Sequence, residues 1–146
     1  MSVAMLMDRT TTALVALLLF GTASQAQPNK EQYELQERCG KRAAEFFAKA
    51  WASEVSNTAS GQTRANYENH YNSRLNKCIY LEISNSFQRG EPPFRLMRLF
   101  DLNENREIAT YMKSEGDAFA FLCSVQDKGC RTEAEWRTLI KPFMED

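Results

Sequence analysis

The chain has 146 residues, of which 43% are hydrophobic, and its 18 basic and 19 acidic residues leave a formal net charge of −1 at pH 7. Because the two signs are scattered along the sequence, it has neither the basic footprint of a nucleic-acid-binding protein nor a polybasic membrane patch, and we expect no nucleic-acid partner. The sequence contains one histidine and four cysteines, which restricts the metal sites and nucleophiles that it can form.

The N-terminal residues have the layout of a secretory signal peptide. Residues 11–23 are apolar, and Ser24 and Ala26 place small residues at the −3 and −1 positions of a cleavage site. The alternative is a membrane-anchoring helix, but the apolar run is shorter than the roughly 20 residues needed to span a bilayer. We therefore expect residues 1–26 to be removed and residues 27–146 to form one globular domain. That domain would be periplasmic or extracellular, with no stable membrane anchor after cleavage.

An amphipathic helix is expected at the start of this domain. Its middle contains Gly40, which costs about 1 kcal/mol relative to Ala in a helix and could reflect a close approach such as a neighbouring disulfide. Phe47 widens an apolar stripe whose members recur at steps of three and four, as on one helix face: Leu35, Cys39, Ala43, Phe46 and Ala50.

The central segment predicts strands. Residues 56–63 (SNTASGQT) read as a polar surface loop. Residues 64–72 alternate like a strand, although Tyr67, Tyr71 and Leu75 also fit helical spacing. Residues 77–84 are a firmer strand, and residues 85–93 are a loop marked by Gly and Pro. The two faces of the firmer strand would be Ile79, Leu81 and Ile83 on one side and Cys78, Tyr80 and Glu82 on the other.

The C-terminal part predicts a hairpin, a further strand and a helix. Residues 94–102 and 106–112 form the hairpin, with Arg98 interrupting one apolar face. Residues 117–125 are the further strand, and QDKG is the turn after it. The helix begins at Thr132, where TEAE has the spacing of a capping box, and Pro142 ends or kinks it. Its buried stripe would be Trp136, Leu139, Ile140 and Phe143.

This order predicts an α+β fold. We expect an antiparallel sheet of about four to five strands, packed by an N-terminal and a C-terminal helix. Four cysteines in an exported chain are expected to be paired, and three connectivities are open. We predict Cys39–Cys78, which would fasten the first helix to the sheet, and Cys123–Cys130, a clip across a short loop. The main rival is a crossed pattern.

Metal and redox chemistry find little support in the sequence. His70 is the only histidine, and no C-x-x-C pair is present, so neither a two-His site nor a zinc or redox dithiol motif is formed. Residues 101–107 contain part of a calcium-loop pattern, but Arg106 occupies the glycine position and Met112 the bidentate acid position. We expect no metal ion and no cofactor.

The binding candidates are weak. Tyr67, His70, Tyr71 and Tyr80 could form an aromatic binding face, although ordinary sheet packing is the alternative. His70 could also act as a general base with a nearby acid or hydroxyl group, but no G-x-S-x-G turn accompanies it. We expect no catalytic residue.

Three stretches carry a resemblance: NHYNSRLNKC, DLNENREIATY and EAEWRTLIKPFMED. Together they resemble a group of small, functionally uncharacterised bacterial exported proteins. The resemblance implies a periplasmic or secreted protein and assigns no activity. We therefore expect a non-enzymatic binding or structural module whose partner is an envelope or secreted component. The alternative is a small hydrolase that uses His70 with a nearby Asp, Glu or Ser.

Overall fold

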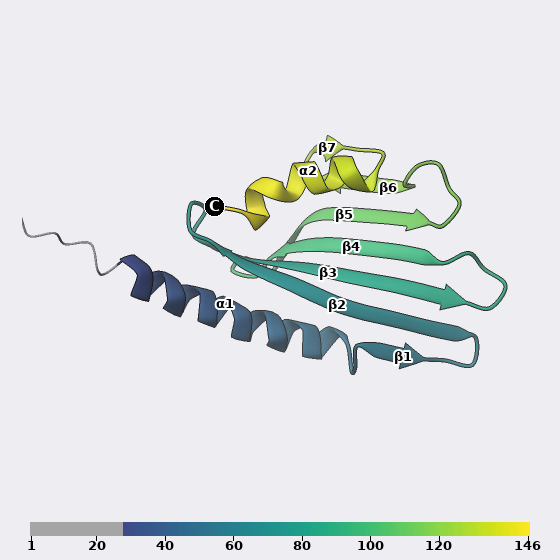
Figure 1. Ribbon diagram of the computed structural model, residues 1–146, viewed down its shortest axis with the longest axis horizontal. Coiled ribbons are helices and arrows are strands. Elements are labelled where there is room, and N and C mark those ends of the chain that lie inside the picture. Colours follow the sequence, from purple (N-terminus) through teal and green to yellow (C-terminus); the bar gives the residue numbers. More distant parts are fainter. Residues whose placement is uncertain (1–27) are drawn as a thin grey trace, which may run out of the picture.

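The computed structural model describes residues 28–146, so the expected signal peptide, residues 1–26, lies outside the described residues. Two helices frame one sheet (Figure 1). The elements in chain order are α1 (Pro28–Ala50), β1 (Val55–Asn57), β2 (Gly61–Asn72), β3 (Lys77–Gln88), β4 (Phe94–Asp101), β5 (Arg106–Ser114), β6 (Leu122–Val125), β7 (Lys128–Gly129) and α2 (Glu133–Met144).

The sheet is an antiparallel meander in which every strand pairs with its neighbours in the sequence, in the order β1 to β7. The α+β class and the antiparallel sheet are confirmed, but the expected number of four to five strands is wrong, because the sheet has seven. The two unexpected strands are β1, which runs into the start of the expected loop over residues 56–63, and β7, in the expected QDKG turn. Both are short and exposed, so they carry no apolar alternation that could reveal them.

Several strand boundaries also differ from the prediction: β2 begins at Gly61, inside the expected loop over residues 56–63, and β5 continues to Ser114. β3 continues to Gln88 because β2 pairs with it over its whole length, from Gly61 opposite Gln88 to Asn72 opposite Lys77. The strand expected over residues 117–125 begins only at Leu122, and the residues before it form an exposed connection from β5. The polar end of β3 is therefore longer than expected, and the connection between β5 and β6 forms a projecting loop beside it.

The two helices cover opposite faces of the sheet, since they pack against alternate residues of β3. The α1 face carries Cys78 and Tyr80, and the α2 face carries Ile79 and Leu81, as the alternation in this strand predicted. The helix α1 packs against β2 and β3, whereas α2 (yellow in Figure 1) lies over the sheet beside β5 and β6.

Both helices use the apolar stripes expected from the sequence. In α1, Cys39, Ala43 and Phe47 are buried, whereas Ala50 is exposed, contrary to the prediction, because the helix ends there. In α2, Trp136 is completely buried. The Thr132 hydroxyl caps α2 by accepting a hydrogen bond from the backbone N–H of Glu135 at 3.2 Å, as the capping spacing predicted.

Proline does not stop α2 at once. The helix continues for two residues beyond Pro142, to Met144, and the backbone N–H of Glu145 closes it by bonding the Lys141 carbonyl. Because proline has no backbone N–H, the helix lacks one hydrogen bond at Pro142. Few helical residues follow this position, so little of the helix is disturbed.

Two disulfides join Cys39 to Cys78 and Cys123 to Cys130, and these are the two pairs that we predicted. The first fastens α1 to the start of β3, and the second links β6 to the segment that leads into α2. Because disulfides persist in oxidising compartments, the pairs indicate a non-cytoplasmic environment. Within residues 28–146, no helix combines the length and the apolar character needed to cross a membrane.

Candidate functional site

The only histidine contacts an acid but no nucleophile. The Nε2 atom of His70 lies 3.4 Å from Oδ1 of Asp146, and the same oxygen accepts the backbone N–H of Ser73 at 2.9 Å. These contacts, the Ser73 N–H first, hold the pKa of Asp146 below its usual value. The carboxylate thus lies between the imidazole and the serine, and no hydrogen bond joins His70 to a hydroxyl among the described residues. A base–nucleophile pair needs that contact.

The polar residues around His70 hold the end of α2. Asn72 is completely buried, and its amide donates to the carbonyls of Pro142, Phe143 and Glu145 at 3.0 to 3.2 Å. Its carbonyl oxygen accepts the backbone N–H of Leu75 in the β2–β3 turn. Asn72 therefore satisfies the last carbonyls of the helix, which is a structural role.

The three tyrosines that were candidates for a binding face lie on the α1 side of the sheet. Tyr71 and Tyr80 are buried, and the ring of Tyr67 stacks on Tyr80 with centroids 5.4 Å apart. Burial, reinforced by the charge of Glu82, raises the pKa of Tyr80 well above its ordinary value. These rings pack against α1, while His70 is on the other face, so the four candidates do not form one surface.

A buried ion pair explains why Arg98 interrupts an apolar face of β4. Glu82 is 1% exposed, and its Oε1 accepts hydrogen bonds from Nε and Nη2 of Arg98 at 3.1 and 2.6 Å. Its Oε2 accepts the indole N–H of Trp51 at 3.0 Å. Both carboxylate oxygens are therefore occupied, as buried charges require, and Glu82 is not free to act as an acid or a base.

A cleft of about 390 Å³ opens on the α2 face, between the sheet and the start of α2. Its floor is a row of in-register polar residues on three neighbouring strands: Asn85 of β3 pairs with Arg95 of β4, which pairs with Lys113 of β5. Arg131 and Glu133, at the start of α2, form the facing wall. The volume falls within the range of small-molecule sites, about 300–1,000 Å³.

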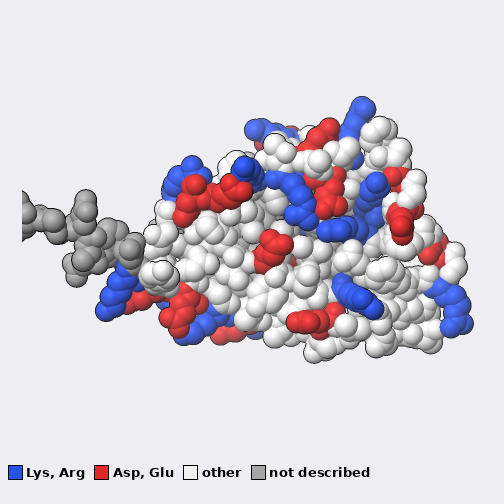
Figure 2. Space-filling model, in the orientation of Figure 1, with Lys and Arg blue, Asp and Glu red and all other residues white. Residues whose placement is uncertain are grey.

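The cleft has an excess of positive charge. Three of its lining residues are basic, Arg95, Lys113 and Arg131, and two are acidic, Glu115 and Glu133. Within the described part of the chain, Lys113 and Arg131 have no carboxylate within 4 Å, and the Nε atom of Arg95 is buried without a hydrogen-bond partner. Figure 2 shows basic side chains gathered near the start of α2, with acidic ones between them.

Glu133 is already engaged by the protein itself. Its Oε1 lies 3.5 Å from Nη2 of Arg95 and 2.8 Å from Nε of Arg137, which comes from the next turn of α2. The helix thus holds this carboxylate in place beside the cleft. Lys113 and Arg131 have no acidic partner in the described part of the chain, and Arg95 keeps its Nη1 group for an incoming anion, because only its Nη2 lies near Glu133.

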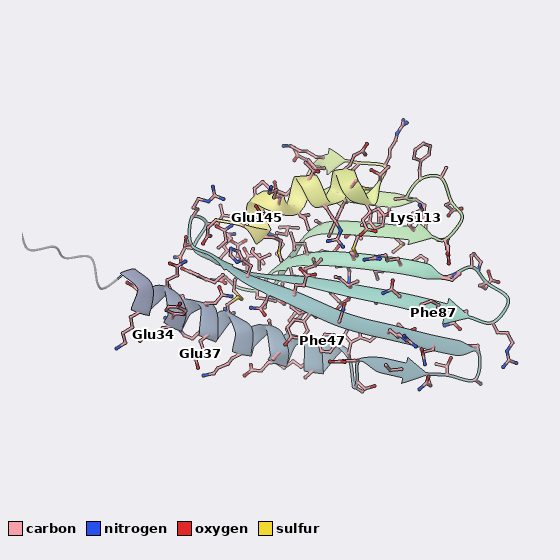
Figure 3. The ribbon with its side chains drawn as sticks, viewed as in Figure 1. Glu34, Glu37, Phe47, Phe87, Lys113 and Glu145 are labelled. Atoms are coloured by element: carbon pink, nitrogen blue, oxygen red, sulfur yellow. A yellow bond between two sulfur atoms is a disulfide. The ribbon has the colours of Figure 1, made fainter. Side chains whose placement is uncertain are left out.

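Aromatic side chains form the outer wall of the cleft. Phe87 follows Asn85 by two residues on the same face of β3 and is 44% exposed. Pro93 and Phe94 also line the cleft, and the ring of Phe94 contacts that of Phe121 with centroids 5.7 Å apart. In Figure 3, Lys113 and Phe87 lie toward the same end of the sheet. The cleft therefore joins a basic floor to an apolar rim.

Sequence reasoning missed the cleft. Its floor depends on the register of three strands. Asn85 and Phe87 fall within residues 85–93, which were expected to form a loop, so the prediction did not place them in the sheet. Lys113 likewise lay beyond the expected end of its strand. A usable signal was the run of polar residues after Ser84, which breaks the apolar alternation of β3. No family model, curated protein or solved structure matches this chain.

Proposed function

We propose that the protein is a non-enzymatic binding module of an exported, envelope or secreted kind, and that it recognises an anionic ligand in the cleft between β3–β5 and the start of α2. The observation that carries the proposal is the convergence of Arg95, Lys113 and Arg131 on one concave site. These residues come from two strands and the approach to α2. A few convergent polar groups in a partly apolar pocket are the usual mark of a ligand site.

The lining residues favour binding over catalysis. The cleft contains no histidine or cysteine. Of its three hydroxyl groups, that of Thr132 already caps α2, and burial raises the pKa of the Tyr111 phenol. The Ser114 hydroxyl makes no hydrogen bond to a carboxylate or an amine among the described residues. The hydrolase alternative requires His70, which does not line the cleft and whose acid contact is shared with a backbone amide.

Export of the protein is part of the same proposal. Its support is the signal-peptide layout of residues 1–26, the resemblance to small bacterial exported proteins and the two disulfides, which need an oxidising compartment. Intact-mass analysis of exported protein tests it, and a mass that retains the apolar segment would refute cleavage after Ala26.

The binding function is tested by NMR titration of ¹⁵N-labelled exported protein with inorganic phosphate and with 4-phenylbutyrate. We expect saturable shifts of the backbone amides of Arg95, Lys113 and Arg131 with at least one of these anions. Lys113→Met should weaken them, whereas Lys49→Met, an equal charge loss on exposed α1, should not. Absence of shifts at the cleft with both anions would refute the proposal.

A parallel assay addresses the hydrolase alternative. Turnover of a simple ester such as 4-nitrophenyl acetate by the exported protein is compared with turnover by His70→Ala. We expect both rates to equal the background rate. Turnover that His70→Ala abolishes, with the fold intact by circular dichroism, would favour the hydrolase.

A further inference from the structure

We infer that the ligand of this cleft is a small amphipathic anion with a single anionic group, a carboxylate or a phosphoryl group, joined by a short linker to an aromatic or other apolar body. This inference rests on the proposed binding function and adds the chemical class of the ligand. It comes from the arrangement of charge along the floor and of aromatic rings at the rim.

The floor fits one anionic oxygen group. Arg95 and Lys113 are directly paired across β4 and β5, and neighbouring strands lie about 4.8 Å apart. A guanidinium and an ammonium carried by such paired positions can each donate to a different oxygen of one carboxylate or phosphoryl group. Asn85 extends the same row on β3 and offers an amide donor to either oxygen.

The balance of charge favours a ligand with a single anionic group. The acidic lining residues, Glu115 and Glu133, offset two of the three basic ones, which leaves an excess of one positive charge. A polyphosphate would meet these two carboxylates and be repelled by them. A single anionic group on the Arg95–Lys113 side of the cleft neutralises the excess.

The rim supplies the apolar half of the site. Phe87 is two residues beyond Asn85 on the same face of β3, a distance of about 6.6 Å along the strand. Its ring is exposed, and Pro93 also lines the cleft. An aromatic body joined to the anionic group by a short chain spans this distance. Contact with Phe87 and Pro93 would then remove apolar surface from water on both partners.

The test compares probes that separate the two halves of the ligand. The binding constants of 4-phenylbutyrate and phenyl phosphate are measured by NMR titration beside those of acetate, inorganic phosphate and the neutral 4-phenylbutanol. We expect at least one aromatic anion to bind at least tenfold more tightly than acetate, inorganic phosphate and the alcohol. A preference for 4-phenylbutyrate would assign a carboxylate and a preference for phenyl phosphate a phosphoryl group, and either outcome supports the inference.

Two variants assign the halves to residues. Lys113→Met should weaken the aromatic anion at least tenfold, and Phe87→Ser should weaken it severalfold while leaving acetate binding unchanged. Both side chains are partly or largely exposed, so the fold should survive, which urea unfolding checks. Lys49→Met on α1 is the matched charge control.

The outcomes separate this inference from the function on which it rests. If acetate or inorganic phosphate binds as tightly as the aromatic anions, and the binding depends on Lys113, the amphipathic ligand is wrong and the anion-binding cleft stands. If 4-phenylbutanol binds as well as 4-phenylbutyrate, the charge requirement is wrong. If no anion perturbs the cleft, both proposals fail.

Discussion

Removal of the Cys39–Cys78 disulfide should cost more stability than removal of Cys123–Cys130. The first bond joins residues 39 apart in the sequence and the second joins residues 7 apart. In the chain-entropy description, a cross-link stabilises the fold by restricting the unfolded chain, and the effect grows with the logarithm of the loop. It amounts to about 4 kcal/mol for the long loop and about 2.5 kcal/mol for the short one.

Among the described residues, the long-loop disulfide is also the only cross-link between the side chains of α1 and those of the sheet. Cys39 and Cys78 are 3% and 4% exposed, so a double alanine variant leaves a small cavity in addition to the lost cross-link. Because a domain of this size has a total stability of about 5–15 kcal/mol, the long-loop variant should approach the limit of folding.

The assay is equilibrium urea unfolding of both double variants, Cys39→Ala with Cys78→Ala and Cys123→Ala with Cys130→Ala. We expect the first pair to lose at least 1 kcal/mol more free energy of unfolding than the second. Equal losses, or a larger loss for the short loop, would show that the long cross-link does not restrict the unfolded chain as argued. A change in the slope of the transition would mark an altered unfolded state.

Three further predictions concern individual side chains. Trp136→Ala should reduce the free energy of unfolding by about 3–5 kcal/mol in urea titrations, because the side chain is completely buried; a loss below 1 kcal/mol would contradict its central place in the core. Gly40→Ala should raise the stability by about 0.5–1 kcal/mol, since an added Cβ would lie 3.8 Å from Asn69 Nδ2, an ordinary contact, and the helix gains from Ala; a lower melting temperature would refute this reasoning. The folded protein lowers the pKa of Asp146, so the ionised carboxylate stabilises the fold at pH values above its ordinary pKa of 3.8. This stabilisation is lost as the pH falls below that value. Asp146→Asn should therefore flatten the decline of the melting temperature in acid, and an unchanged acid profile would show that the contacts to Ser73 and His70 do not matter.

The helices could be predicted from the sequence because their signals are local. The stripe through Cys39 and Ala43 and the cap at Thr132 depend on residues three or four positions apart, which the helix itself brings together. The alternation in β3 is also a local signal, and it identified the two buried faces of the strand. The position of Cys39 on the inward stripe of α1 led to the predicted Cys39–Cys78 disulfide, which the structure contains. These features belong to single elements, and the structure confirms them.

The cleft could not be predicted because it belongs to no single element. Asn85, Arg95 and Lys113 become neighbours only through the register of β3 with β4 and of β4 with β5. A slip of one residue in either pair would turn them to the other face. The strands β1 and β7 were missed for another reason, since exposed polar strands lack the apolar alternation on which recognition depends.

Intermolecular NOEs between 4-phenylbutyrate and the protein locate the bound probe on the molecule. If the cleft is the ligand site, the aromatic protons of the probe should show NOEs to the ring of Phe87. The methylene beside the carboxylate should show NOEs to the side chain of Lys113. NOEs that place the probe beside His70, or on the tyrosine-bearing face under α1, would contradict the central claim, as would a saturated complex without NOEs to Phe87 or Lys113.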